Sequence, residues 1–132
     1  MLISKLQICA VALGCGLGGI AQADELGKAE YMNACASCHG ESAAGDGPLA
    51  ELMTVPVPAL TGLTAANDGV YPMLKVIHSI DGRQGTRGHG YPMPVWGQRF
   101  SRDIENPGPY GAEMAIRGRV LSIAYYLESI QK

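Results

Sequence analysis

The strongest apolar periodicity lies near the carboxyl end of the chain. Apolar residues recur there at spacings of four and three, at Ile116, Val120, Ile123, Leu127 and Ile130. This spacing places them on one helix face, so we predict a helix from near Gly111 to about Ser129. The apolar stripe of that helix must be buried against another element.

Two further helices are predicted upstream. The first covers residues 25–35, with Asp24 as its cap and with Gly27 and Tyr31 one turn apart on a shared face. The second is capped by Asn67 or Asp68, and it tolerates Pro72 in its first turn. Its apolar face carries Met73, Ile77 and Ile80, and Gly82 ends it.

The segments between these helices are rich in glycine and proline, which favours loops in residues 40–62 and 81–111. We expect one short helical turn at residues 49–53 and nothing longer than a turn in residues 81–111. No stretch alternates apolar and polar residues over the length that a sheet needs. The predicted fold is therefore all-α, with three main helices and long loops, and a loop this long is usually functional.

The amino-terminal residues are typical of an export signal. Lys5 supplies a positive charge, residues 6–13 form an apolar segment, and Ala21-Gln22-Ala23 matches a cleavage site. We expect a signal peptide over residues 1–23, cleavage after Ala23, a mature domain over residues 24–132, and a periplasmic location. Two alternatives stay open: residues 6–23 remain as a membrane anchor, or Cys15 carries a lipid.

The composition of the mature chain limits the classes of partner that it can bind. Removing Lys5 leaves nine basic and twelve acidic residues, a formal charge of −3, which makes nucleic acid an improbable partner. The only remaining thiols are those of Cys35 and Cys38. A domain this small gains apolar bulk from a buried prosthetic group.

Those two cysteines belong to the motif Cys35-Ala36-Ser37-Cys38-His39-Gly40. A Cys-x-x-Cys followed directly by histidine is the attachment signature of a covalent c-type haem, with a thioether at each cysteine and the imidazole on the iron. Zinc would need a second ligand pair, and His78 and His89 stand alone. A redox dithiol would need a βαβ context, and a plain disulfide is the remaining alternative.

Met93 is the predicted ligand on the other side of the iron. It lies in the sequence Pro92-Met93-Pro94, where the flanking prolines restrict the backbone and reduce the entropic cost of presenting the side chain. His89, between two glycines, is the main alternative, and His78 on the second helix is a weaker one. The other methionines lie in or beside helices or close to the attachment site.

Two residues are expected to support the haem from nearby. The indole of Trp96 can donate its N–H to a haem propionate, although a core aromatic without a polar role is the simpler alternative. The free N–H of a metal-bound histidine usually donates to a carbonyl or carboxylate, and the carbonyl of Pro48 is a candidate partner for His39.

Four segments carry a family resemblance: the attachment motif, Gly45-Asp46-Gly47-Pro48, Met93-Pro94-Val95-Trp96-Gly97 and Tyr126-Leu127. With them the chain resembles the class I bacterial monohaem cytochromes c. The resemblance implies one covalent haem c, with first and last helices that cross near it at Gly27, Tyr31, Ile123 and Tyr126. It also supports Pro48 and Met93 in the roles given above. The mature chain has only three lysines, which places a lysine-ringed docking face in doubt.

An iron with both axial positions filled has no open site for substrate, so we expect an electron carrier and not an enzyme. The partners would be redox proteins, and the protein itself a monomer. Arg83, Arg87, Arg99 and Arg102 bracket the methionine loop and could form a positive docking rim. Pairing of these arginines with propionates, Asp81 or Asp103 is the alternative. A subunit dedicated to one dehydrogenase or reductase, or a gas-binding sensor, are the other functions considered.

Overall fold

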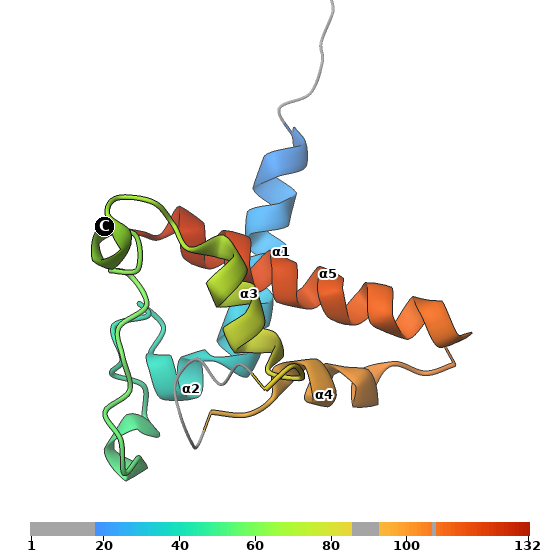
Figure 1. Ribbon diagram of the computed structural model, residues 1–132, viewed down its shortest axis with the longest axis horizontal. Helices are drawn as coiled ribbons and strands as arrows, with labels where there is room; N and C mark the ends of the chain where they lie inside the picture. The colour runs from blue at the N-terminus through green and yellow to red at the C-terminus, as the bar shows by residue number, and fades with distance from the viewer. Residues whose placement is uncertain (1–17, 86–92, 107) are drawn as a thin grey trace, which may run out of the picture.

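The computed structural model describes residues 18–85, 93–106 and 108–132, and every regular element in them is helical. Figure 1 shows α5 running across the molecule, with α1 and α3 crossing it and α4 beneath it. The α-helices are α1 (Gly18–Ala34), α2 (Ala36–His39), α3 (Met73–Asp81), α4 (Trp96–Phe100) and α5 (Gly108–Ser129). Three short 3-10 helices are η1 (Ala50–Leu52), η2 (Ala65–Asn67) and η3 (Ser101–Asp103).

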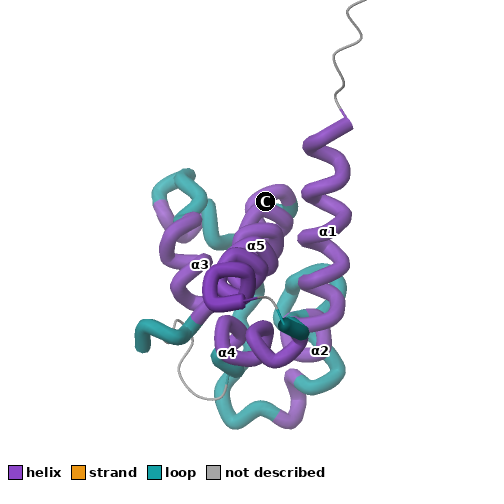
Figure 2. The backbone as a smooth tube through the Cα atoms, turned by 90° about the vertical axis from the view of Figure 1, so that its right-hand side faces the viewer, coloured by secondary structure: helices purple, strands orange, loops and turns teal. Residues whose placement is uncertain are grey.

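The crossing of α1 and α5 is the most extensive helix contact, and Figure 2 shows it from the side. A Cβ atom on Gly27 would overlap the carbonyl oxygen of Ser122 and lie 2.9 Å from Cβ of Tyr126, so the two backbones meet where only glycine fits. One turn further on, the rings of Tyr31 and Tyr126 lie 5.3 Å apart. The predicted crossing of the first and last helices is confirmed.

The apolar stripe predicted for the last helix is the centre of the core. Ile116, Val120, Ile123 and Leu127 are buried, and Ile130 packs against them. The helix ends at Ser129, as predicted, and begins at Gly108, three residues before the predicted start. Pro109 accounts for the earlier start, because a proline in the first turn of a helix removes no needed hydrogen bond.

Two predicted helix starts are wrong. In the full chain α1 begins at Gly18, because residues 20–23 include good helix formers, so Asp24 lies inside the helix and does not cap it. Helix α3 begins at Met73 with Pro72 as its cap, whereas Asn67 closes η2 and Asp68 is left-handed at φ 54°. The residue before a proline disfavours helix, which separates the two elements. Gly82 ends α3 as predicted, at φ 66°.

Helix α4 was not predicted, because five residues are too few for a periodic pattern. It is held by packing: Phe100 is 2 % exposed, and its ring lies 5.5 Å from that of Trp96, one turn earlier. The short turn predicted at residues 49–53 is present as η1. The glycine- and proline-rich segment after residue 93 thus carries a helix that tertiary packing alone stabilises.

Candidate functional site

The attachment motif lies at a break between two helices. Cys35 separates α1 from α2, yet its amide donates to the carbonyl of Tyr31 over 2.8 Å, and the amides of Cys38 and His39 donate to its own carbonyl over 3.1 and 2.9 Å. Helical hydrogen bonding therefore continues through the break. This backbone arrangement places Cys35, Cys38 and His39 in the wall of one cavity. Cys35 and His39 are buried there, and Cys38 is half-buried.

The imidazole of His39 is oriented by a backbone carbonyl. Its Nδ1 atom lies 3.1 Å from the carbonyl oxygen of Pro58, in the extended segment Val55-Pro56-Val57-Pro58. The predicted partner, Pro48, is wrong. The amides of Gly47 and Leu49, on either side of Pro48, donate to the carbonyls of Cys38 and Ser37 over 3.1 and 2.8 Å, so this turn binds the backbone of the attachment helix instead of the imidazole.

The glycine turn still acts on His39, but through Pro58. Gly45 has φ 85°, and a Cβ there would overlap the carbonyl oxygen of Val57 and lie 3.2 Å from the carbonyl carbon of Pro58. Beyond the proline, the amide of Leu60 donates to the carbonyl of Ala43 over 2.8 Å. The side chain of Gln131, just past α5, donates to the carbonyl of Leu60 over 2.8 Å. The Pro58 carbonyl is thus fixed from both sides.

Two cavities meet at the attachment motif. One of about 420 Å³ has Val55, Pro56, Val57 and Pro94 in its walls, and one of about 260 Å³ is lined by core residues such as Leu60, Val76, Ile80, Ile123 and Leu127. Among the described residues, Cys35, His39, Pro58 and Met93 are the ones that line both cavities. His39 and Met93 therefore face a common apolar space within the size range of cofactor sites.

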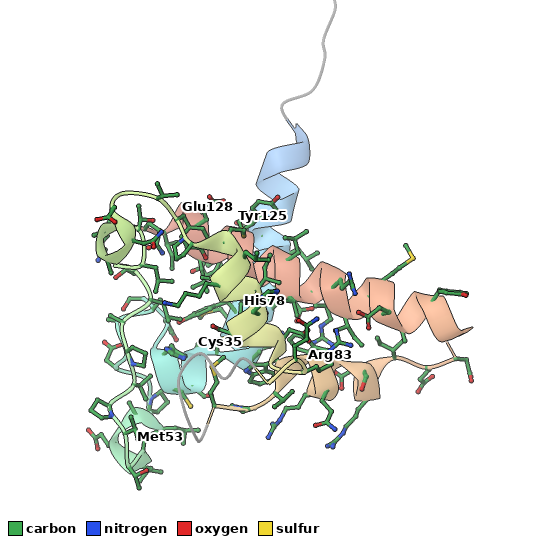
Figure 3. The ribbon with its side chains drawn as sticks, in the orientation of Figure 1. Cys35, Met53, His78, Arg83, Tyr125 and Glu128 are labelled. Atoms are coloured by element: carbon green, nitrogen blue, oxygen red, sulfur yellow. The ribbon has the colours of Figure 1, made fainter. Side chains whose placement is uncertain are left out.

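The other predicted ligand candidates lie elsewhere. Met53 lines only the first cavity, from the loop at the lower left of Figure 3, and Met73 packs into the core from α3. Met32 and Met114 are exposed. His78 lies in a separate groove between α3 and α5, and His89 lies outside the described residues.

The cysteine pair does not have the character of a redox dithiol. Burial, with a smaller effect of the neighbouring Cys38, raises the pKa of Cys35 to about 12. A reactive Cys-x-x-Cys depends on the opposite shift, since the thiolate is the reacting species. The two sulfurs are not joined in a disulfide, and within the described residues no cluster of His, Cys, Asp or Glu could hold a metal ion such as zinc.

Trp96 is half-buried at the start of α4 and lines the first cavity. The guanidinium of Arg99 lies 5.4 Å from the centre of its ring and lines the same cavity. The face of the indole is therefore covered by a cation at the rim. This places two groups able to interact with a carboxylate at the cavity wall.

The four arginines predicted to share a rim do not behave alike. Arg83 pairs with Asp81 and Glu113 over 2.6 and 2.7 Å, which is the pairing alternative and not the docking one. Arg99 and Arg102 are exposed, and neither forms an ion pair within the described part of the chain. Asp103 pairs with Arg119 instead of Arg102. Arg87 lies outside the described residues.

Sequence reasoning missed Pro58 at this site, and it missed Arg119, which joins α5 to α1 and α4 outside the two cavities. Pro58 was recognised only as part of an extended segment, although a rigid proline carbonyl following the attachment loop was the available signal. Arg119 was also missed: its guanidinium lies 3.9 Å from the Phe100 ring centre and binds Glu30 of α1 over 2.9 Å. No local pattern identifies such a contact, because its partners lie on α1 and α4, outside the helix that carries Arg119.

The donor set fits a covalently attached haem. Two thiols three positions apart lie at the wall of an apolar cavity, a buried imidazole is held by a carbonyl, and a thioether faces the same space. Softer sulfur and nitrogen donors in an apolar site suit iron in a macrocycle better than a hard cation.

Comparison with known proteins agrees with this chemistry. A family model described as Cytochrome c matches residues 25–104. No curated protein and no solved structure gives a significant match. In the described residues, no helix combines the length and the apolar character needed to cross a bilayer.

Proposed function

The chain belongs to the cytochrome c family, and we propose that it is a periplasmic one-electron carrier whose haem iron is ligated by His39 and Met93. Members of the family bind haem c covalently, and the all-helical arrangement agrees with the class I monohaem fold. When bound, haem c supplies an iron that alternates between the ferrous and ferric states. The observation that carries the proposal is that His39 and Met93 line both cavities beside the cysteines.

In this proposal each residue has a defined task. Cys35 and Cys38 form the two thioethers, and His39 gives its Nδ1–H to the Pro58 carbonyl, which fixes the plane of its ring. The thioether of Met93 favours the ferrous state and raises the reduction potential relative to a second histidine. Val55, Val57 and Pro94 supply apolar groups to the wall of the first cavity.

Ligation is tested on the holoprotein expressed with export to the periplasm. We compare oxidised and reduced visible spectra and the reduction potential for Met93→Ala and for Met53→Ala, a matched methionine that lines only the first cavity. Met93→Ala should remove the thioether-to-iron charge-transfer absorption of the ferric protein and lower the potential, whereas Met53→Ala should keep both. If Met93→Ala leaves the spectrum and potential unchanged, the ligation proposal is wrong.

The location is proposed from the amino-terminal sequence. We infer export, cleavage after Ala23 and release of residues 24–132 into the periplasm. Mass spectrometry of the purified protein should give the mass of residues 24–132 plus one haem. A retained amino-terminal segment, or a lipid on Cys15, would contradict this inference.

The partner-docking proposal now rests on Arg99 and Arg102. Both are exposed, and Arg99 lies at the cavity rim beside Trp96, where its charge can attract an acidic partner and where both groups can bind a propionate. Reversing both charges should slow electron transfer to a partner and weaken the dependence of that rate on salt. Unchanged rates would contradict it, and stable copurification with one dehydrogenase would indicate a dedicated subunit instead of a free carrier.

A further inference from the structure

We propose that Arg83 is a positioning residue for Met93: it clamps the end of α3 to α5 and so supports the segment that leads from Met93 into α4. This inference rests on the proposed ligation of iron by Met93. The clamp lies outside both cavities of the attachment site, in the groove between α3 and α5 where Figure 3 shows Arg83.

The guanidinium of Arg83 joins two elements that are far apart in the chain. Its Nε atom donates to Oδ1 of Asp81, the last residue of α3, over 2.6 Å. Its Nη1 and Nη2 atoms donate to the two carboxylate oxygens of Glu113 on α5 over 2.7 and 3.2 Å. The planar fork of arginine suits this bidentate geometry, which lysine cannot reproduce.

The same ion pair lies against the backbone of α4. A Cβ atom on Gly97 would overlap Oδ1 of Asp81, and it would lie 2.9 Å from Cγ of Asp81 and 2.5 Å from Nε of Arg83. Gly97 is the second residue of α4 and is buried. The paired side chains therefore cover the helix turn that begins three residues after Met93.

A second contact supports the segment between Met93 and α4. A Cβ atom on Gly82, which ends α3 at φ 66°, would lie 3.4 Å from Cα of Val95. The neighbouring Asp81 and Arg83 hold the turn at Gly82 in place. This turn packs against Val95, and the ion pair packs against Gly97. The position of Met93 in the cavities depends on both contacts.

Loss of the clamp should act mainly on the ligand and less on global stability. The side chain of Arg83 is 31 % exposed, and pairs at such sites stabilise a fold only modestly. Its loss frees the first turn of α4, which is the end of the helix that follows Met93. Exogenous imidazole can occupy the sixth position of the ferric iron only when the Met93 thioether leaves it, so the rate of imidazole binding reports this freedom.

The test compares Arg83→Gln with Arg117→Gln in the ferric holoprotein. Arg117 pairs with the same Glu113 over 2.6 Å but is 76 % exposed, so its loss removes a similar charge without uncovering α4. We expect Arg83→Gln to bind imidazole roughly tenfold faster, because it loses about one charge-assisted hydrogen bond. The charge-transfer absorption of this variant should also be weaker. Arg117→Gln should stay within about twofold of the unsubstituted protein.

Arg83→Lys and Asp81→Asn make the assignment specific. Arg83→Lys keeps the charge but loses the fork, and it should bind imidazole faster than the unsubstituted protein. Asp81→Asn weakens the pair from the α3 side and should do the same, and it replaces Arg83→Gln if that variant does not fold. Thermal unfolding of every variant is measured so that rates are compared where all are folded.

The outcomes separate the two proposals. Equal imidazole rates in Arg83→Gln and Arg117→Gln, with a normal charge-transfer absorption, would overturn the clamp and leave Met93 ligation intact. Absence of that absorption from the unsubstituted protein would overturn the ligation proposal itself.

Discussion

The Nδ1 atom of His39 lies 3.1 Å from the carbonyl oxygen of Pro58, nineteen residues further along the chain. Gly45 makes this possible, because its left-handed backbone and missing side chain let the glycine turn lie against Val57 and Pro58. The orientation of the imidazole therefore depends on a glycine whose own hydrogen bond to His39 is made by the backbone, from the Gly45 amide to the His39 carbonyl over 2.8 Å.

Gly45→Ala should destabilise the holoprotein and raise its reduction potential. The left-handed φ costs about 1–2 kcal/mol, and the overlap with Val57 adds about 1–3 kcal/mol. Displacing the Pro58 carbonyl weakens the hydrogen bond that makes the imidazole more basic, which disfavours the ferric state. Denaturant unfolding and spectroelectrochemistry measure the two effects.

Gly69→Ala is the matched control, because Gly69 has φ 80° and nothing within 4 Å of an added Cβ. It should show only the backbone cost of about 1–2 kcal/mol and no change in potential. Equal potentials in the two variants would refute the link between Gly45 and the imidazole.

Gly27→Ala should destabilise the crossing of α1 and α5 even though alanine favours helix. Its methyl group would overlap the Ser122 carbonyl and Tyr126, so the helices must separate, at a cost of about 1–3 kcal/mol. Gly118→Ala on α5 meets nothing within 4 Å and should stabilise the protein by about 0.5–1 kcal/mol. Opposite signs in thermal unfolding are the expected result, and a gain in stability from Gly27→Ala would contradict the crossing.

Stability should fall at alkaline pH through Tyr71. Burial raises the pKa of its hydroxyl, which donates to the carbonyl of Ala124 over 2.9 Å. The folded state therefore keeps a proton that the unfolded chain loses above pH about 10, so the stabilisation is complete below that pH and decreases above it, by up to about 1.4 kcal/mol per pH unit.

Tyr71→Phe should reduce this dependence, measured as the free energy of unfolding between pH 9 and pH 11 in roughly half-unit steps, and part of the slope should stay because burial also raises the pKa of Tyr31. Tyr125→Phe, at a side chain that is 48 % exposed on α5, is the control and should leave the slope as it is. A slope that Tyr71→Phe does not change would assign the alkaline loss to another group.

Arg119→Leu should destabilise the protein far more than Arg117→Leu. Both arginines lie on α5, and they differ in what surrounds them. Arg119 binds Glu30 of α1 and Asp103 of η3 over 2.9 and 2.8 Å and covers the Phe100 ring, so its loss leaves Glu30, only 16 % exposed, without its partner. We expect a cost of about 2 kcal/mol for Arg119→Leu and about 0.5 kcal/mol or less for Arg117→Leu. Similar unfolding free energies would show that Arg119 does not join the three segments.

Features carried by adjacent residues were predictable from the sequence. The attachment motif, the stripe from Ile116 to Leu127 and the helix end at Gly82 each follow from local spacing or from one residue type. The crossing at Gly27 was also predicted, because the family resemblance indicated that the first helix packs against the last one. The glycine by itself does not indicate which element it contacts.

Features that depend on contact between distant segments were not predictable. Pro48 lies in a glycine-rich turn and Pro58 in an extended segment ten residues later, and only the wrapping of residues 40–60 decides which carbonyl reaches His39. Helix α4 exists because Phe100 is buried, and Arg83 is bound because α3 and α5 bring Asp81 and Glu113 together.

By itself, then, the sequence determined that this chain is helical and that its chemistry centres on Cys35, Cys38 and His39, because short-range spacing sets both helix faces and attachment geometry. The tertiary structure decided which backbone carbonyl orients His39 and which carboxylates pair with Arg83. These are choices among chemically equivalent groups, and only the packing of distant segments distinguishes one from another.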